Sequence, residues 1–142
     1  MDTIQRVLIK AGRKDLAQKY YKRIAKIDHF THQQLINAIS YLQKATPKDY
    51  KEAMRTSGEG MDEPEKMKFI DFYFGTDGLY AHYKAVFENE KKSWINKSDS
   101  MEEKPYYATS IFISWNGKNF YGSYSGQPDF IDEDEIDRAL RG

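Results

Sequence analysis

The chain has 142 residues, of which 39% are hydrophobic and 15% aromatic, with no cysteine and a formal net charge of zero. This length suits one domain, and the lack of cysteine excludes disulfides, thiol nucleophiles and thiolate metal sites. No apolar run approaches the ~20 residues that span a bilayer, and the first residues do not have the pattern of a signal peptide. We therefore expect a cytoplasmic protein with no membrane partner.

The charge is distributed unevenly along the chain. Residues 1–60 hold 12 Lys and Arg against 6 Asp and Glu, whereas residues 61–142 hold 10 against 16. A chain polarised in this way usually presents surfaces of opposite sign, which face different partners or each other. Each half is therefore a candidate binding surface.

Residues 1–57 predict a basic, helical part of the chain. Apolar residues recur at helical spacing over residues 4–11 and again over residues 14–27. Thr31 and Thr46 are each placed to cap a further helix, because a hydroxyl at that position can accept the first unpaired backbone N–H groups. We expect four helices here.

Residues 62–96 predict two aromatic-rich helices. Asp62 suits a helix N-cap, and apolar residues follow it at helical spacing as far as Phe74. Two glycines, Gly75 and Gly78, mark a break before the second and longer helix. A tight turn between two helices is the expected result.

In the first part of residues 105–142, the hydrophobic pattern changes to the two-residue period of β-strands. Residues 116–117 are Asn-Gly, a strong signal for a hairpin with a type I′ turn, because both central residues of that turn have positive φ. Counting outward from this turn places Ile113 opposite Phe120. An acidic helix over residues 132–140 closes the chain, with acids in its first turn as the helix dipole favours.

The predicted fold is a single α+β domain over residues 1–142. It is mostly helical, with five or six helices, a C-terminal two-stranded antiparallel hairpin and a closing helix. An isolated hairpin is marginal in water, so it must dock on helices or pair with the edge of another chain. The second arrangement would produce a homodimer.

The known catalytic and metal-binding motifs are missing. A nucleophile elbow has Ser at the centre of Gly-x-Ser-x-Gly, where residues 122–126 place Tyr. His29 and His32 lack a further ligand at a recognisable spacing, and the acidic run 129–137 lacks the glycine of an EF-hand loop. We therefore predict no metal and no cofactor, and we assign no catalytic residue.

The acidic start of the last helix is a candidate protein-binding surface. Carboxylates on a helix can imitate a phosphate backbone and occupy a basic groove, although a solvated helix end explains them equally well. Our first hypothesis is therefore a non-enzymatic protein that binds another macromolecule. The candidate partner-binding residues are Asp132, Glu133, Asp134 and Glu135.

The basic second helix makes nucleic acid an alternative partner. Three lysines fall together on a helical wheel, with a tyrosine at the margin, and this combination suits phosphate contacts and base stacking. The second hypothesis is a nucleic-acid-binding accessory protein, and an ordinary solvated helix face is the competing explanation. The residues concerned are Lys19, Tyr21, Lys22 and Lys26.

A small hydrolase is the third hypothesis. The segment DFYFGTDGLYAHY, residues 71–83, gathers acids, tyrosines and a histidine around a glycine break. Asp71, Asp77 and His82 would carry the chemistry. An aromatic core crossed by a tight helix–helix turn explains the same segment without any catalysis.

Three segments resemble small bacteriophage proteins: KAGRKDLAQKY, DFYFGTDGLY and ISWNGKNFYGSYSG. They cover about a quarter of the chain and transfer no catalytic or binding residue. The resemblance implies a protein of a phage or mobile element that acts in a bacterial cytoplasm. It also implies that the partner is a host or phage protein complex, with inhibition of a host defence or replication complex as the role.

Overall fold

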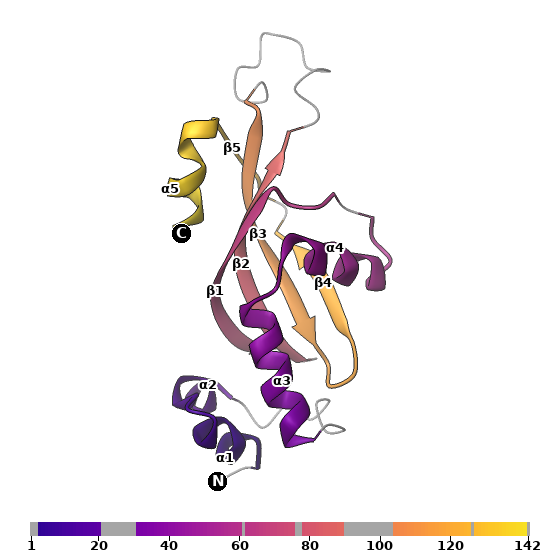
Figure 1. Cartoon of the computed structure of the whole chain (residues 1–142), viewed down its shortest axis with the longest axis vertical. Coiled ribbons are helices and arrows are strands. Elements are labelled where there is room, and N and C mark those ends of the chain that lie inside the picture. The colour runs from indigo at the N-terminus through magenta and orange to yellow at the C-terminus, as the bar shows by residue number, and fades with distance from the viewer. Residues whose placement is uncertain are drawn as a thin grey trace.

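A computed structural model describes residues 3–20, 31–60, 62–75, 78–89, 104–125 and 127–141. A five-stranded antiparallel sheet organises this part of the chain, in the order β1-β2-β3-β4, with β5 also paired to β3 (Figure 1). The strands are β1 (Lys66–Gly75), β2 (Gly78–Glu88), β3 (Tyr106–Trp115), β4 (Phe120–Tyr124) and β5 (Asp129–Ile131). The helices are α1 (Thr3–Lys10), α2 (Lys14–Lys19), α3 (His32–Gln43), α4 (Pro47–Thr56), the 3-10 turn η3 (Glu133–Glu135) and α5 (Ile136–Leu140).

The prediction of two helices over residues 62–96 is wrong, and so is the prediction that the fold is mostly helical. The strands β1 and β2 occupy most of this segment and form a hairpin of their own. Every second residue of β2 from Leu79 to Phe87 is buried, and Val86 is buried as well, on the opposite face. A strand that is covered on both faces places apolar residues next to each other, so its sequence can imitate helical spacing.

The predicted helix starts in the first part of the chain are confirmed. The Thr31 hydroxyl accepts the backbone N–H of Gln34 at 3.1 Å, and the Gln34 side chain accepts the N–H of Thr31 at 2.7 Å. Thr46 and Asp49 form the same reciprocal box at the start of α4. Gly12, just beyond α1, has φ of +77°, as a glycine helix end requires.

The second helix is shorter than predicted. It ends at Lys19, and Tyr20 already has an extended backbone. The rest of the predicted helix, residues 21–27, lies outside the described residues. None of the helices in the described parts of the chain is long and apolar enough to cross a membrane.

The strands β3 and β4 form the predicted late hairpin, but two residues out of the predicted register. Ile113 pairs with Gly122, and a four-residue connection replaces the two-residue turn. In that connection the Asn116 side chain accepts the backbone N–H of Asn119 at 2.8 Å, and only Gly117 has positive φ. Because a type I′ turn needs positive φ at Asn116 as well, this turn does not form. The shift is even, so each side chain keeps its predicted face.

The hairpin does not need a second chain to be covered. The strand β3 pairs with β2 along its whole length, so the hairpin continues a larger sheet. The strand β4 packs beneath α4, where a Cβ at Gly122 would lie 2.8 Å from the backbone nitrogen of Met54. The hairpin is therefore supported within its own chain and does not require a homodimer, which stays a prediction.

One face of the sheet holds the main core. Helices α1 to α4 cover this face, and their apolar side chains form one cluster with those of β1, β2 and β3. The buried phenol of Tyr83 donates a hydrogen bond to the carbonyl of Leu42 at the end of α3, which ties the sheet to that helix. The largest fully buried rings in this cluster are Tyr50, Phe72, Tyr83 and Phe87.

The opposite face is covered at one end by α5. A small apolar cluster of Val86, Ala108, Ile131 and Ile136 lies there, and Figure 1 shows α5 on the side of the sheet away from α3 and α4. The remainder of this face carries polar and aromatic side chains that no described helix covers. We call it the open face, and its residues on β1 to β3 are Lys66, Lys68, Asp71, Tyr73, Tyr80, His82, Lys84, Ser110, Phe112 and Ser114.

Candidate binding site on the open face of the sheet

Three hydrogen-bonding side chains form a row across the open face. The Nδ1 atom of His82 lies 3.4 Å from Oδ1 of Asp71, and its Nε2 atom lies 2.9 Å from Oγ of Ser110. Each residue comes from a different strand: β1, β2 and β3 in turn. The order carboxylate, imidazole, hydroxyl is the one that activates the nucleophile in serine hydrolases.

A β-bulge in β1 places the carboxylate in this row. Phe69 pairs with Tyr83, but the next residue of β2, His82, pairs with Asp71. Ile70 is the extra residue, and it is 36% exposed. Bulges shift the alternation of side chains between the two faces, which here brings Asp71 to the open face beside His82.

Aromatic rings lie next to this row. Tyr73 and Tyr80 stack with centroids 5.0 Å apart and planes 11° apart, and Phe112 meets Tyr73 edge-on at 6.3 Å. His82 stacks on Phe112 at 5.1 Å, so the imidazole is held by a ring as well as by two polar partners. Tyr73 lies on the edge strand β1 and is 40% exposed. Mutual packing therefore fixes these rings at the surface.

Lysines occupy the other part of the open face. Lys68 and Lys84 stand directly opposite each other on β1 and β2, and Lys66 lies two residues before Lys68 on the same face. Among the described residues, none of the three is within ion-pair distance of a carboxylate. Like charges directly opposite each other destabilise a sheet, so this pair weakens the isolated fold.

A cavity of about 490 Å³ opens beside Ser110 and Lys84. It forms because β3 changes partner: residues 111–115 pair with β4 and residues 106–108 pair with β5, which leaves residues 109–110 between the two. Arg138 of α5 reaches the cavity, although Glu135 holds it at 2.8 Å. The lining residues are Lys84, Ala108, Thr109, Ser110, Ser125, Gln127, Asp129, Ile131, Glu135, Arg138 and Ala139.

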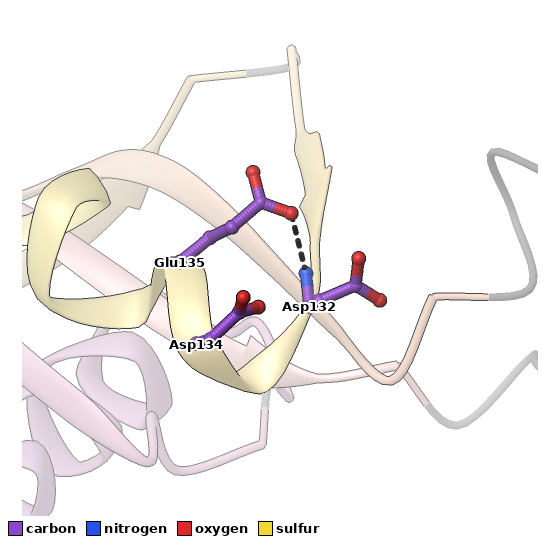
Figure 2. Close-up of side chains that lie close together, drawn as sticks. All are labelled: Asp132, Asp134 and Glu135. Atoms are coloured by element: carbon purple, nitrogen blue, oxygen red, sulfur yellow. Dashed lines mark hydrogen bonds between the residues drawn. The ribbon is translucent and has the colours of Figure 1, made fainter.

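Two of the four predicted acidic residues, Asp132 and Glu135, are engaged in local contacts. Figure 2 shows the Glu135 carboxylate turned back to the backbone N–H of Asp132, at 3.1 Å. Lys104 lies 3.8 Å from Asp132 and 3.5 Å from Glu135. The backbone N–H of Asp132, with help from the nearby cations, holds the pKa of Glu135 below its usual value. Carboxylate oxygens of Asp132, Asp134 and Glu135 lie within 4.8 Å of one another, but a helix start explains the group.

The predicted basic stripe falls mostly outside the described residues. Lys19 is the last residue of α2 and is exposed. Tyr21, Lys22 and Lys26 lie in the part of the chain that the structure does not describe. The basic stripe therefore stays a prediction.

Two of the three residues of the hydrolase hypothesis come together, and sequence analysis missed a third. Asp71 and His82 are neighbours across β1 and β2, whereas Asp77 lies outside the described residues. Ser110 is 28 residues from His82 and meets it only through the pairing of β2 with β3. No local motif surrounds Ser110, so only a correct strand assignment for β2 could have found it.

Comparison with known protein families, with curated proteins and with solved structures gives no match. The open face is therefore interpreted from its own chemistry. That chemistry has two parts: lysines without a carboxylate partner in the described part of the chain, beside a ring cluster in which Tyr73 is exposed, and the row of Asp71, His82 and Ser110.

Proposed function

We propose that this protein binds an anionic macromolecule on the open face of its sheet and carries out no reaction on it. The observation that supports this proposal is a set of three lysines, Lys66, Lys68 and Lys84, that have no carboxylate partner among the residues the structure describes, in a chain of zero net charge. A bound anion would relieve the repulsion between Lys68 and Lys84. The proposal keeps the non-enzymatic binding role of the first hypothesis and transfers it to different residues.

The exposure of these lysines favours a macromolecule over a small anion. Ion pairs in contact with solvent contribute only about 0–1 kcal/mol each, so one anion on this surface would bind weakly. A polymer engages several lysines at once, and it gains further affinity by releasing the counterions around its own charges. The open face extends over three strands, which is enough for such a ligand.

Charge reversal at Lys68 tests the proposal. In Lys68→Glu the new carboxylate lies opposite Lys84, so we expect the fold to gain about 0.2–1 kcal/mol while binding weakens. The measurement is retention on a heparin column, with urea unfolding of the same samples. Lys51→Glu, on an exposed position of α4, is the control with the same change in net charge. Equal elution of the two variants, or no retention of the unmodified protein, would contradict the proposal.

Hydrolysis at Ser110 is a second candidate function, and the hydrogen-bonded row across β1 to β3 favours it. His82 would take the hydroxyl proton as Oγ of Ser110 attacks a carbonyl carbon, and Asp71 would keep the imidazole oriented. An oxyanion needs preorganised N–H donors, which a nucleophile at a sharp turn usually has beside it. Ser110 lies inside a strand instead, with its carbonyl bonded to the N–H of Ser125 at 2.9 Å. We therefore rank this function second.

Labelling with a fluorophosphonate separates the two candidates. A hydrolase would be labelled at Ser110, and both Ser110→Ala and His82→Ala would abolish the labelling. Ser114→Ala, four residues further along β3 on the same face, is the control. A protein that takes no label at any serine would leave only the binding function.

A further inference from the structure

Resting on the binding function above, we propose that the anionic ligand is a single-stranded nucleic acid. Its bases would stack on the rings around Tyr73, and its phosphates would lie along Lys68 and Lys84. The cluster of rings and the lysine pair occupy one face of the same three strands, and this combination supports the assignment.

The rings distinguish a nucleic acid from other anionic polymers. A sulfated sugar or an acidic protein segment would use the lysines but has no flat group for an exposed ring. Bases stack on aromatic side chains of open sheets, and each such contact is a substantial part of the affinity for single strands. In a duplex the bases are already stacked and paired, so they could not reach Tyr73. The 40% exposure of Tyr73 on an edge strand leaves it accessible to a base.

The spacing along β2 requires a ligand of more than one nucleotide. Tyr80 and Lys84 are four residues apart on this strand, which corresponds to ~13 Å at ~3.3 Å per residue. His82 lies between them with Ser110 at its Nε2 atom, so polar groups that can hydrogen-bond a base edge separate the rings from the cations. The face therefore offers stacking, hydrogen bonding and charge in that order along the sheet.

The test is fluorescence anisotropy with a labelled ~12-nucleotide single strand and the matching duplex, at ~50 and ~200 mM salt, since single-strand sites on one domain cover ~4–16 nucleotides. We expect the single strand to bind more tightly than the duplex. Three lysine contacts predict a slope of log affinity against log salt of about −2, and Lys68→Glu should reduce its magnitude by about 0.7.

The variant Tyr73→Ala should weaken binding of the single strand about ten-fold without changing the salt slope. Tyr73→Phe keeps the ring and should bind as the unmodified protein does, which shows that a loss in Tyr73→Ala is a loss of stacking. Tyr124→Ala is the matched control, because this tyrosine is 48% exposed on β4 but pairs with Ile111 on the other face. It should leave the affinity unchanged.

The outcomes separate this inference from the function on which it rests. The protein could be retained on heparin but bind single strand and duplex equally, with no effect of Tyr73→Ala. That result would overturn the nucleic-acid ligand and leave the binding function in place. The protein could also purify from a bacterial lysate with a protein partner that stays bound at ~300 mM salt and with no nucleic acid at ~50 mM salt. That result would likewise overturn the nucleic-acid ligand and leave the binding function in place. No binding to heparin or to either oligonucleotide would overturn both.

Discussion

Replacing Gly122 with alanine tests how closely α4 lies against β4. An added Cβ would be 2.8 Å from the backbone nitrogen of Met54 and 2.7 Å from its Sδ atom, whereas ordinary contacts begin near 3.4 Å. The hydroxyl of Ser57 donates to the Gly122 carbonyl at 2.9 Å and accepts the Gly122 N–H at 3.0 Å. The strand cannot move away from the helix without straining both bonds.

The expected loss of stability combines two opposite effects. Overpacking a well-filled core costs about 1–3 kcal/mol. Alanine restricts the unfolded chain more than glycine does, which returns about 0.4–1 kcal/mol, because Gly122 does not have a positive φ that would exclude alanine. Because the added Cβ meets a backbone nitrogen that cannot rotate away, the cost should lie in the upper half of that range, which leaves a net loss of about 1–2.6 kcal/mol. For a domain of this size that corresponds to a fall in Tm of roughly 3–8 °C.

Urea unfolding followed by the fluorescence of the buried Trp115 measures this loss. Ser123→Ala, at the exposed neighbouring position of β4, should change the free energy of unfolding by less than about 0.5 kcal/mol. A double-mutant cycle with Met54→Ala separates the two contacts, because that change removes the sulfur but leaves the backbone nitrogen. A Gly122→Ala protein as stable as the unmodified one would refute the close approach of α4 to β4.

Four further predictions concern groups away from the binding face. Tyr83→Phe removes the donor to the end of α3 and should cost about 1 kcal/mol in urea unfolding. Thr46→Ala should cost about 1 kcal/mol through the lost N-cap, and Thr46→Ser should restore most of it. The backbone N–H of Asp132 lowers the pKa of Glu135, so this carboxylate stabilises the fold at neutral pH and loses that effect as the pH falls below 4.5. In Glu135→Gln the free energy of unfolding should therefore depend less on pH in this acidic range. Burial raises the pKa of Tyr41 to about 12 because it disfavours the phenolate, so the unmodified protein should lose stability relative to Tyr41→Phe as the pH rises from 10.0 to about 12.

The charge pattern of the sequence indicated two binding surfaces, both of which stay predictions, and the structure adds the open face as a third candidate. In the acidic surface, the Glu135 carboxylate is engaged by the backbone N–H of Asp132 and by Lys104 and Arg138. The lysines of the open face are separated in the sequence by 16 residues, from Lys68 to Lys84, and do not form a charge run. Runs of charge along a chain report local composition, whereas a binding surface depends on which side chains the fold places together.

Local sequence determined the ends of the helices and the position of the late hairpin. A cap such as Thr31 needs only the backbone N–H groups within three residues of it, so its effect is the same in any fold that contains the helix. Gly12 ends α1 for a similarly local reason, since its positive φ is accessible without a side chain. The polar turn at Asn116 likewise separates two strands whatever lies beneath them.

The tertiary structure alone decided that residues 66–88 are strands and that Asp71, His82 and Ser110 meet. The apolar spacing of this segment fits a helix or a strand covered on both faces, and the choice depends on whether neighbouring strands and α5 are there to cover it. The meeting of the three side chains depends on strand register and on one bulge at Ile70, neither of which leaves a signal in short stretches of sequence. Contacts between residues far apart in the chain are set by packing, and packing is a property of the whole fold.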